Sequence, residues 1–267
     1  HYWGRSDNSW YELLYANLKK FKIPTIQNIN VSVPPLVNDL NCAYIYVSEF
    51  VKKTHGISSV LENVIYPGSN FKLFSSRNLN ESMNCDFVGM VYRLDSDKVN
   101  EKSIDPFIEL CKINSEVKCL IVCDGELLSI YRAKVLAAGF CERFEFTGYV
   151  SYTALPGLYR KMRIFMAPVF DESFGQVTPF AMHIGMPVVG YATGAIGEII
   201  ANNNLLAPPG AAEQLAQICN KIWQDKGKAL EISQFNINRA KDNFSVESMI
   251  ASYQQLYNKY NLPRSNR

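Results

Sequence analysis

The sequence predicts an α/β fold built on parallel sheets, and three observations indicate this. Short apolar runs alternate with runs of helical periodicity over most of the 267 residues. The clearest unit lies at 162–200, where an apolar strand, a polar loop, a helix and a second apolar strand follow in order. The composition is 48% hydrophobic and 12% aromatic, which is ample for a packed core.

The alternation of apolar and helical runs in residues 86–245 predicts one open sheet with helices between its strands. The expected strands are 86–91, 118–123, 143–146, 163–167 and 187–191, with a short sixth at 205–207. The expected helices are 103–114, 127–138, 153–161, 176–184, 196–201, 212–224 and 230–242. This alternation requires right-handed crossovers between parallel strands, which makes the segment a Rossmann-like domain.

Residues 1–75 predict a second, partial Rossmann-like lobe. Its expected helices are 10–20 and 48–55, and its expected strands are 24–30, 42–47 and 64–66. The polar, turn-rich residues 76–85 are interpreted as the linker between the two domains. A last helix is expected from Val246 to Tyr260.

Composition and charge narrow the function classes. The net charge of +2 argues neither for nor against a nucleic-acid partner; no Lys/Arg run stands out, and we expect no such partner. The seven cysteines are spread through apolar runs, which is typical of reduced core thiols and predicts a cytoplasmic protein. Their spacing, and the three scattered histidines, favour no metal site. His183 in particular is interpreted as a core or helix-face histidine.

Two loops carry candidate site residues. In 171–175 (DESFG), Glu172 can accept hydrogen bonds from hydroxyls, and Gly175 opens a helix whose first N–H groups suit a phosphate. After the first strand of the larger domain, Arg93 and Lys98 lie five residues apart. Together they can bind a diphosphate: the arginine can donate two parallel hydrogen bonds, and the lysine acts as a point charge. The alternative is a solvated pair beside Asp95 and Asp97.

These segments resemble the retaining glycosyltransferases of family 4 (group 1). The ordered motifs are ESFG, AM, GMPVVG and TGAIGEII, together with VGMVYRLDSDK, which is similar to the family's G-R-L-x-x-x-K. The resemblance covers most of 40–260. It implies the GT-B fold, two Rossmann-like lobes with parallel sheets, here with an incomplete N-terminal lobe, and a helix at 246–267 that crosses back to that lobe.

The resemblance also implies an activity and its residues. A sugar would pass from a nucleotide-diphosphate-sugar donor to a saccharide, lipid-linked or other hydroxyl acceptor, with retention and without metal or cofactor. Arg93 and Lys98 would stabilise the departing β-phosphate, and Glu172 would hold the donor sugar. Further donor contacts would come from residues at two turns, namely Phe174, Gly175, Gln176 and Val177, and Tyr149 and Val150. For the second turn, a plain βα connection is the alternative.

The chain departs from the family pattern in two places. The family's second glutamate, which holds the ribose hydroxyls, falls at Phe180, and a family histidine loosely aligns with Asn30. Loss of a charged hydrogen bond costs about 1.5–3 kcal/mol. The alternative function is therefore a non-catalytic, degenerate transferase lobe that acts as a binding or partner subunit, and peripheral membrane or partner-subunit contact is expected. A sugar-nucleotide epimerase of the same fold is the least favoured interpretation.

Overall fold

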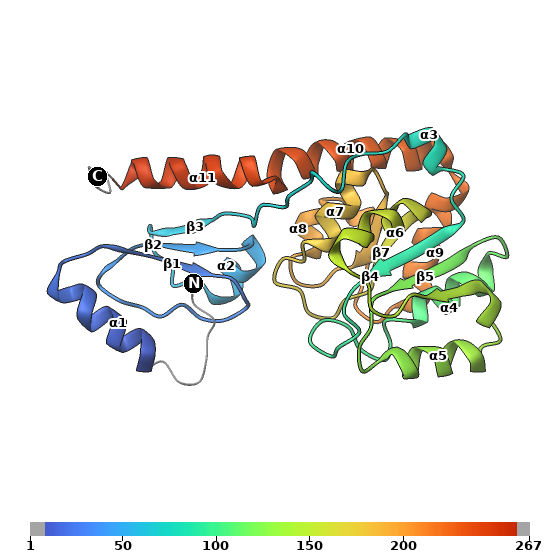
Figure 1. Ribbon diagram of the computed structural model, residues 1–267, viewed down its shortest axis with the longest axis horizontal. Coiled ribbons are helices and arrows are strands. Elements are labelled where there is room, and N and C mark those ends of the chain that lie inside the picture. The colour runs from blue at the N-terminus through green and yellow to red at the C-terminus, as the bar shows by residue number, and fades with distance from the viewer. Residues whose placement is uncertain (1–8, 261–267) are drawn as a thin grey trace. The chain divides into compact units, whose positions relative to one another are not determined.

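The computed structural model describes residues 9–260 and divides into two compact units (Figure 1). Within the described range, the smaller unit takes in 9–68 and 246–260, and the larger unit takes in 69–245. The outer ends of the expected N-terminal lobe and C-terminal helix, 1–8 and 261–267, lie outside that range.

The larger unit is built on a six-stranded, fully parallel sheet in the order β6-β5-β4-β7-β8-β9. Its strands are β4 (Phe87–Val91), β5 (Lys118–Val122), β6 (Phe144–Phe146), β7 (Met162–Ala167), β8 (Val188–Tyr191) and β9 (Leu206–Ala207). All six match the predicted strands within a residue or so. The central strands are buried along almost their whole length, as expected for a parallel sheet covered on both faces.

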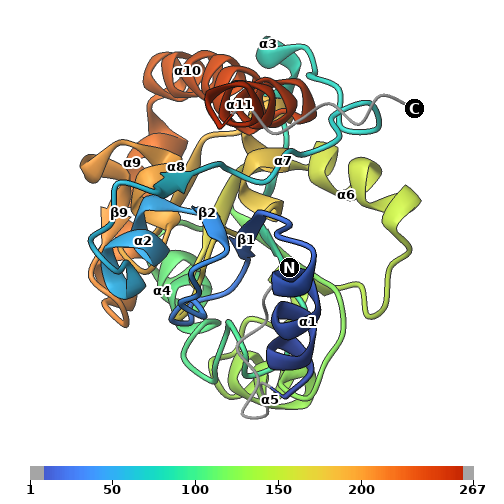
Figure 2. The same ribbon diagram turned by 90° about the vertical axis from the view of Figure 1, so that its left-hand side faces the viewer.

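Eight α-helices of the larger unit lie within the described range. They are α3 (Leu79–Ser82), α4 (Asp105–Ile113), α5 (Leu128–Ala137), α6 (Leu155–Lys161), α7 (Val177–Ile184), α8 (Ile196–Ile200), α9 (Ala212–Gln224) and α10 (Lys226–Phe244). The prediction for α10, 230–242, was too short. Asp225 accepts a hydrogen bond from the backbone N–H of Lys228, and this cap starts the helix four residues earlier. α10 then passes along α3 and α7 (Figures 1 and 2).

The strand order determines where a site can form. Counted within this unit, the order is 3-2-1-4-5-6, so the chain reverses direction across the sheet between β4 and β7. The loops that follow β4 and β7 therefore leave the carboxyl edge side by side. Ligands of open α/β sheets bind at such a reversal point.

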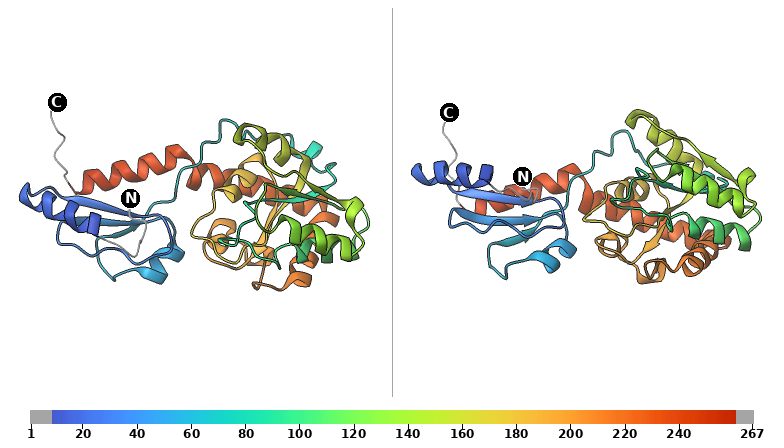
Figure 3. Two further views of the ribbon diagram at one scale, coloured as in Figure 1. Left: turned by 60° about the horizontal axis from the view of Figure 1, so that its bottom comes forward. Right: turned by 90° about the horizontal axis from the view of Figure 1, so that it is seen from below.

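The smaller unit holds a parallel three-stranded sheet, β1 (Thr25–Ile29), β2 (Asn41–Tyr46) and β3 (Glu62–Val64). Its helices are α1 (Ser9–Lys20), α2 (Glu49–His55) and α11 (Val246–Lys259). Ser48 caps α2 as predicted, by accepting a hydrogen bond from the N–H of Val51. α11 lies along this sheet (Figure 3), where Leu256 joins a core cluster with Ala43, Ile45 and Ile65.

The strand predicted at 64–66 was placed two residues too late. The Glu62 carboxylate accepts hydrogen bonds from the Tyr46 hydroxyl at 2.6 Å and from the N–H groups of Ile57 and Ser59, both at 2.8 Å. These contacts hold the beginning of the strand against β2 at Glu62, which apolar patterning does not reveal.

The polar segment expected as a linker, 76–85, lies inside the larger unit. It contains α3, which Asn78 caps through the N–H of Asn80. The N–H of Arg77 donates to the carbonyl of Ile184 at 3.1 Å, and the Leu79 side chain covers Gly185. The boundary between the units falls earlier, at Gly68 and Ser69.

Candidate functional site

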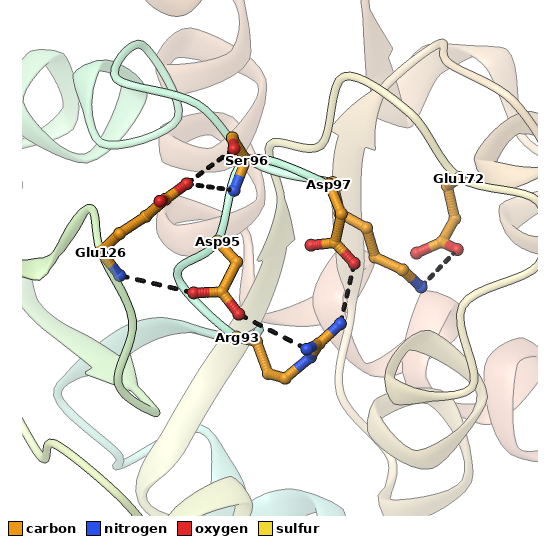
Figure 4. A network of polar contacts seen from close by, with 7 residues as sticks. Arg93, Asp95, Ser96, Asp97, Glu126 and Glu172 are labelled. Atoms are coloured by element: carbon orange, nitrogen blue, oxygen red, sulfur yellow. Dashed lines mark hydrogen bonds and ion pairs between the residues drawn. The ribbon is translucent and has the colours of Figure 1, made fainter.

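The loop after β4 presents Arg93 between two buried side chains, Tyr92 and Leu94. The Arg93 side chain is 71% exposed and is held by two carboxylates (Figure 4). Its Nη2 lies 2.8 Å from Asp97 Oδ2, and its Nη1 lies 3.4 Å from Asp95 Oδ2. The guanidinium is therefore accessible to solvent but already paired.

The turn between β5 and α5 braces this loop. Glu126 Oε1 accepts hydrogen bonds from the Ser96 hydroxyl at 2.6 Å and from the Ser96 N–H at 3.1 Å. These bonds lower the pKa of the Glu126 carboxyl. Gly125, with φ +156°, packs so closely that a Cβ there would lie 2.5 Å from the Leu94 carbonyl. These contacts give the turn a structural role in holding the loop that carries Arg93.

The loop after β7 carries Glu172, whose side chain is only 1% exposed. Its Oε1 pairs with Lys98 Nζ at 2.8 Å and accepts a longer bond, 3.4 Å, from the N–H of Phe174. Its Oε2 is buried and has no hydrogen-bond partner among the described residues. Because buried polar atoms are normally paired, this oxygen is a candidate acceptor for the hydroxyl of a ligand.

The turn after β8 holds the Glu172 backbone in place. The N–H of Ala195 donates to the Glu172 carbonyl at 2.9 Å. Gly194, at φ +52°, lies directly against the same peptide, where a Cβ would collide with the Glu172 carbonyl oxygen. From the sequence, TGAIGE has two interpretations, the family's glycine-rich turn and the plain start of a helix, and neither predicts its contact with Glu172. The signal available was a pair of glycines three residues apart, since close backbone approach requires glycine.

Besides the pair of Lys98 and Glu172, further contacts join the β4 loop to the β7 loop and to α7. The N–H of Phe170 donates to the Lys98 carbonyl at 2.8 Å. Below them, the buried Tyr92 hydroxyl lies 3.5 Å from Thr178 Oγ1, on the first turn of α7. Burial, and then the charge of Glu172, raise the pKa of Tyr92, so this phenol is neutral at physiological pH.

Of the four residues expected at the start of α7, Phe174 and Gly175 lie against Glu172. Gly175, at φ +77°, packs against the Glu172 carboxylate, and Phe174 is buried edge-on against Phe244 at 5.6 Å. Gln176 and Val177 begin the helix. The Phe174 N–H is directed at Glu172 rather than outward, which differs from its expected orientation toward a diphosphate.

Tyr149 and Val150 lie apart from this cluster, in the loop after β6. The strand β5 separates β6 from β4, so the structure does not bring them into contact with Arg93 or Lys98. Tyr149 is 84% exposed. The turn is tight because Gly148 adopts φ +65°.

Phe180, at the position of the family's second glutamate, is buried in an aromatic cluster. Its ring stacks on Phe74 at 4.0 Å and meets the edges of Phe71 and Tyr152. His183 belongs to the same cluster, as expected of a core histidine, because it stacks on Phe71 and its Nδ1 lies 2.9 Å from the Phe74 carbonyl. A carboxylate at Phe180 would have to be buried among apolar rings.

The arrangement can bind an anion and a hydroxyl side by side. Lys98, which is 40% exposed, pairs with the buried Glu172, whose Oε2 has no partner among the described residues, and the exposed Arg93 lies in the same loop as Lys98. Within 9–260 there is no group of three or more His, Cys, Asp or Glu side chains that could hold a metal ion. In the same range, no helix is long and apolar enough to cross a membrane.

Curated relatives of this chain are bacterial glycosyltransferases. It is 25% identical over 178 residues to the 2-deoxystreptamine glucosyltransferase of Streptomyces kanamyceticus, covering 64% of this chain and 46% of that protein. It is 24% identical over 180 residues to the lipopolysaccharide core biosynthesis mannosyltransferase LpsB of Rhizobium meliloti, covering 64% and 51%. The chain thus spans about half the length of these two relatives.

Solved structures show the same fold. Anabaena Alr3699/HepE in complex with UDP superposes with a TM-score of 0.77 at 20% identity, over 94% of this chain and 77% of that one. A glycosyltransferase from Rickettsia africae gives 0.75 at 18% identity, over 97% and 84%. The fold is therefore α/β and of the GT-B type. The sequence profile of the family "Glycosyl transferases group 1" matches residues 86–225, more than half of the chain, and the chain belongs to that family.

Proposed function

We propose that this chain takes part in transferring a hexose from a nucleoside-diphosphate sugar to an acceptor hydroxyl, with retention of configuration and without a metal ion or cofactor. The observation that carries this proposal is the meeting of Arg93, Lys98 and Glu172 where the strand order reverses between β4 and β7. The names of the relatives and the UDP complexes of HepE support it.

At the phosphate end, the proposed role of the two cations is electrostatic. As the bond between sugar and β-phosphate breaks, negative charge grows on the diphosphate, and Arg93 and Lys98 stabilise it. Such a contact is typically worth about 3 kcal/mol of transition-state energy. Gly175, Gln176 and Val177 would add backbone contacts at the start of α7, where the helix dipole favours an anion.

At the sugar end, Glu172 would orient the donor through its hydroxyls. Its Oε2 is the buried oxygen without a partner, and a sugar hydroxyl would satisfy it. Because the side chain is 1% exposed, the loop 171–175 has to open for the sugar to reach it. Lys98 would then pass from Glu172 to the phosphate.

At the nucleotide end, Tyr149 and Val150 would contact the base. Tyr149 is exposed and free to stack, and its loop lies two strands from that of Arg93. Adjacent strands are about 4.8 Å apart, so the separation is about 10 Å, which a nucleoside diphosphate can span. The proposed acceptor is a saccharide, a lipid-linked or another hydroxyl compound, with no nucleic-acid partner. All seven cysteines are free thiols, which supports a cytoplasmic location.

The test is titration calorimetry with UDP, GDP, ADP and dTDP and with the corresponding nucleosides. Arg93→Ala and Lys98→Ala are expected to weaken diphosphate binding about tenfold or more, with nucleoside binding little changed. Lys228→Ala is the control, because this exposed lysine of α10 is paired with Glu231. Equal losses for diphosphate and nucleoside would refute the phosphate assignment.

The burial of Phe180 favours a second candidate, a non-catalytic lobe that serves as a binding or partner subunit. In that case no nucleoside diphosphate binds selectively, and no transfer occurs. Turnover of a sugar nucleotide by the protein would exclude this candidate.

A further inference from the structure

Both Nη atoms of Arg93 are occupied by carboxylates of its own loop. The shorter contact, 2.8 Å, is to Asp97, whose side chain is 46% exposed. Asp97 lies four residues after Arg93, so the pair closes within a single loop (Figure 4). An incoming phosphate therefore meets an arginine that already has an anionic partner.

The two aspartates have different surroundings. Asp95 is tied to the neighbouring turn, because its Oδ1 accepts a hydrogen bond from the Glu126 N–H at 3.4 Å, and its contact with Arg93 is the longer one, 3.4 Å. For the Asp97 carboxylate, the contact that the structure shows in the described chain is the one with Arg93. The Asp97 carboxylate takes no part in the hydrogen bonds between Ser96 and Glu126.

We propose that Asp97 is the internal counter-ion that a diphosphate displaces from Arg93, and that it thereby sets the affinity of the site for phosphate. This inference rests on the proposed function, which places the diphosphate at Arg93. In the unliganded chain Asp97 positions the guanidinium at the mouth of the site. In the liganded chain its charge remains beside the phosphates and opposes them, which limits the affinity and speeds release.

The magnitudes make the exchange feasible. An exposed, singly charged pair such as Arg93–Asp97 is worth at most about a fivefold factor in an equilibrium constant. A diphosphate carries more charge than one carboxylate and can engage the guanidinium bidentately, so it wins the competition. Displacing the Asp97 carboxylate from Arg93 costs free energy, and the displaced carboxylate still repels the phosphates. Together these two effects should weaken diphosphate binding by the wild-type protein a few-fold.

The experiment is titration of wild-type protein and Asp97→Asn with inorganic pyrophosphate and with nucleoside diphosphates at low salt. The variant is expected to bind both about three- to fivefold more tightly, with nucleoside binding unchanged. The gain should vanish in an Arg93→Ala background. It should also shrink at about 0.5 M salt, because exposed charges are then screened. A merely structural change at Asp97 would show neither dependence.

The control is Glu231→Gln, which removes one negative charge from an exposed pair on α10 and is expected to leave pyrophosphate binding unchanged. Equal or weaker pyrophosphate binding by Asp97→Asn, or no binding by either protein, overturns the counter-ion assignment. If the pyrophosphate effect is present but no nucleoside diphosphate binds to wild-type protein, the proposed donor site fails, whereas Asp97 remains the counter-ion of an anion site.

Discussion

At the scale of single residues, Glu172 and Lys98 form the most consequential pair. The carboxylate is almost fully buried, while the lysine is 40% exposed and is the cation that neutralises it across 74 residues of sequence. A buried charge that loses its partner destabilises the fold, so Lys98 has a structural as well as a binding role.

Lys98→Ala is therefore expected to lower the free energy of unfolding by about 2 kcal/mol, less than for a fully buried pair because Lys98 is partly exposed. Adding Glu172→Gln to Lys98→Ala should recover a large part of that loss, since the buried group is then neutral. Urea unfolding of the single and double variants measures both. A double variant no more stable than Lys98→Ala would contradict this account.

Glu126 gives a prediction about pH. Hydrogen bonds from Ser96 lower its pKa below the ordinary value of about 4.3, so the folded state favours the ionised form more than the unfolded state does. The resulting stabilisation is present above that pH and is lost as the pH falls through the lowered pKa. In Ser96→Ala, the Glu126 pKa should return toward its ordinary value, as carbon-detected NMR titration of the carboxyl can show. An unchanged pKa would mean that the Ser96 hydroxyl is not the cause, since the Ser96 N–H remains in the variant.

At the scale of elements, four loops at one edge of the sheet support each other. The β4 loop rests on the turn before α5, the β7 loop rests on the glycine turn after β8, and the two loops share the bond from Phe170 to Lys98. Glycines stand where backbones approach most closely. The geometry of the candidate site therefore depends on residues that would not touch a ligand, notably Gly194.

Gly194→Ala is expected to lower the free energy of unfolding by about 2 kcal/mol or more, because φ is +52° and the added Cβ meets the Glu172 peptide. Diphosphate binding should weaken with it. The matched control is Gly157→Ala in α6, where nothing lies within 4 Å of the added Cβ. There the change should stabilise by about 0.5–1 kcal/mol. Thermal unfolding compares the two variants. Similar effects of both substitutions would show that Gly194 does not support the Glu172 peptide.

At the scale of the whole molecule, the chain forms two units with separate cores. The candidate site residues all belong to the larger unit, whereas the C-terminal helix α11 contributes Leu256 to the core of the smaller unit. Changes in the smaller core should therefore leave the site intact.

Leu256→Ala tests this separation. Leu256 is 5% exposed, and its truncation should lower the free energy of unfolding of the smaller unit by about 2–5 kcal/mol. Hydrogen exchange should rise in β2, β3 and α11 and stay unchanged in β4, β5 and β7, with diphosphate binding preserved. An equal rise in both units would show that they unfold as one.

Local patterning was sufficient for the order of elements. Apolar runs ending at Val91 and Ala167, and helices closed by residues such as Gly185, predicted the α/β alternation of the larger unit almost residue by residue. The same patterning placed Arg93, Lys98 and Glu172 after strands. These features depend on neighbours a few residues apart, which is why one sequence reveals them.

The tertiary structure alone decided which of these residues meet. The pairing of Lys98 with Glu172, the support of Glu172 by Gly194, the orphan Glu172 oxygen and the burial of Phe180 against Phe74 all join segments distant in sequence. The segment 76–85 was misplaced as a linker for the same reason, since its polar composition does not show the backbone bond from Arg77 to Ile184. Strand order and packing bring such segments together, and the spacing of residues along the chain does not show which segments will meet.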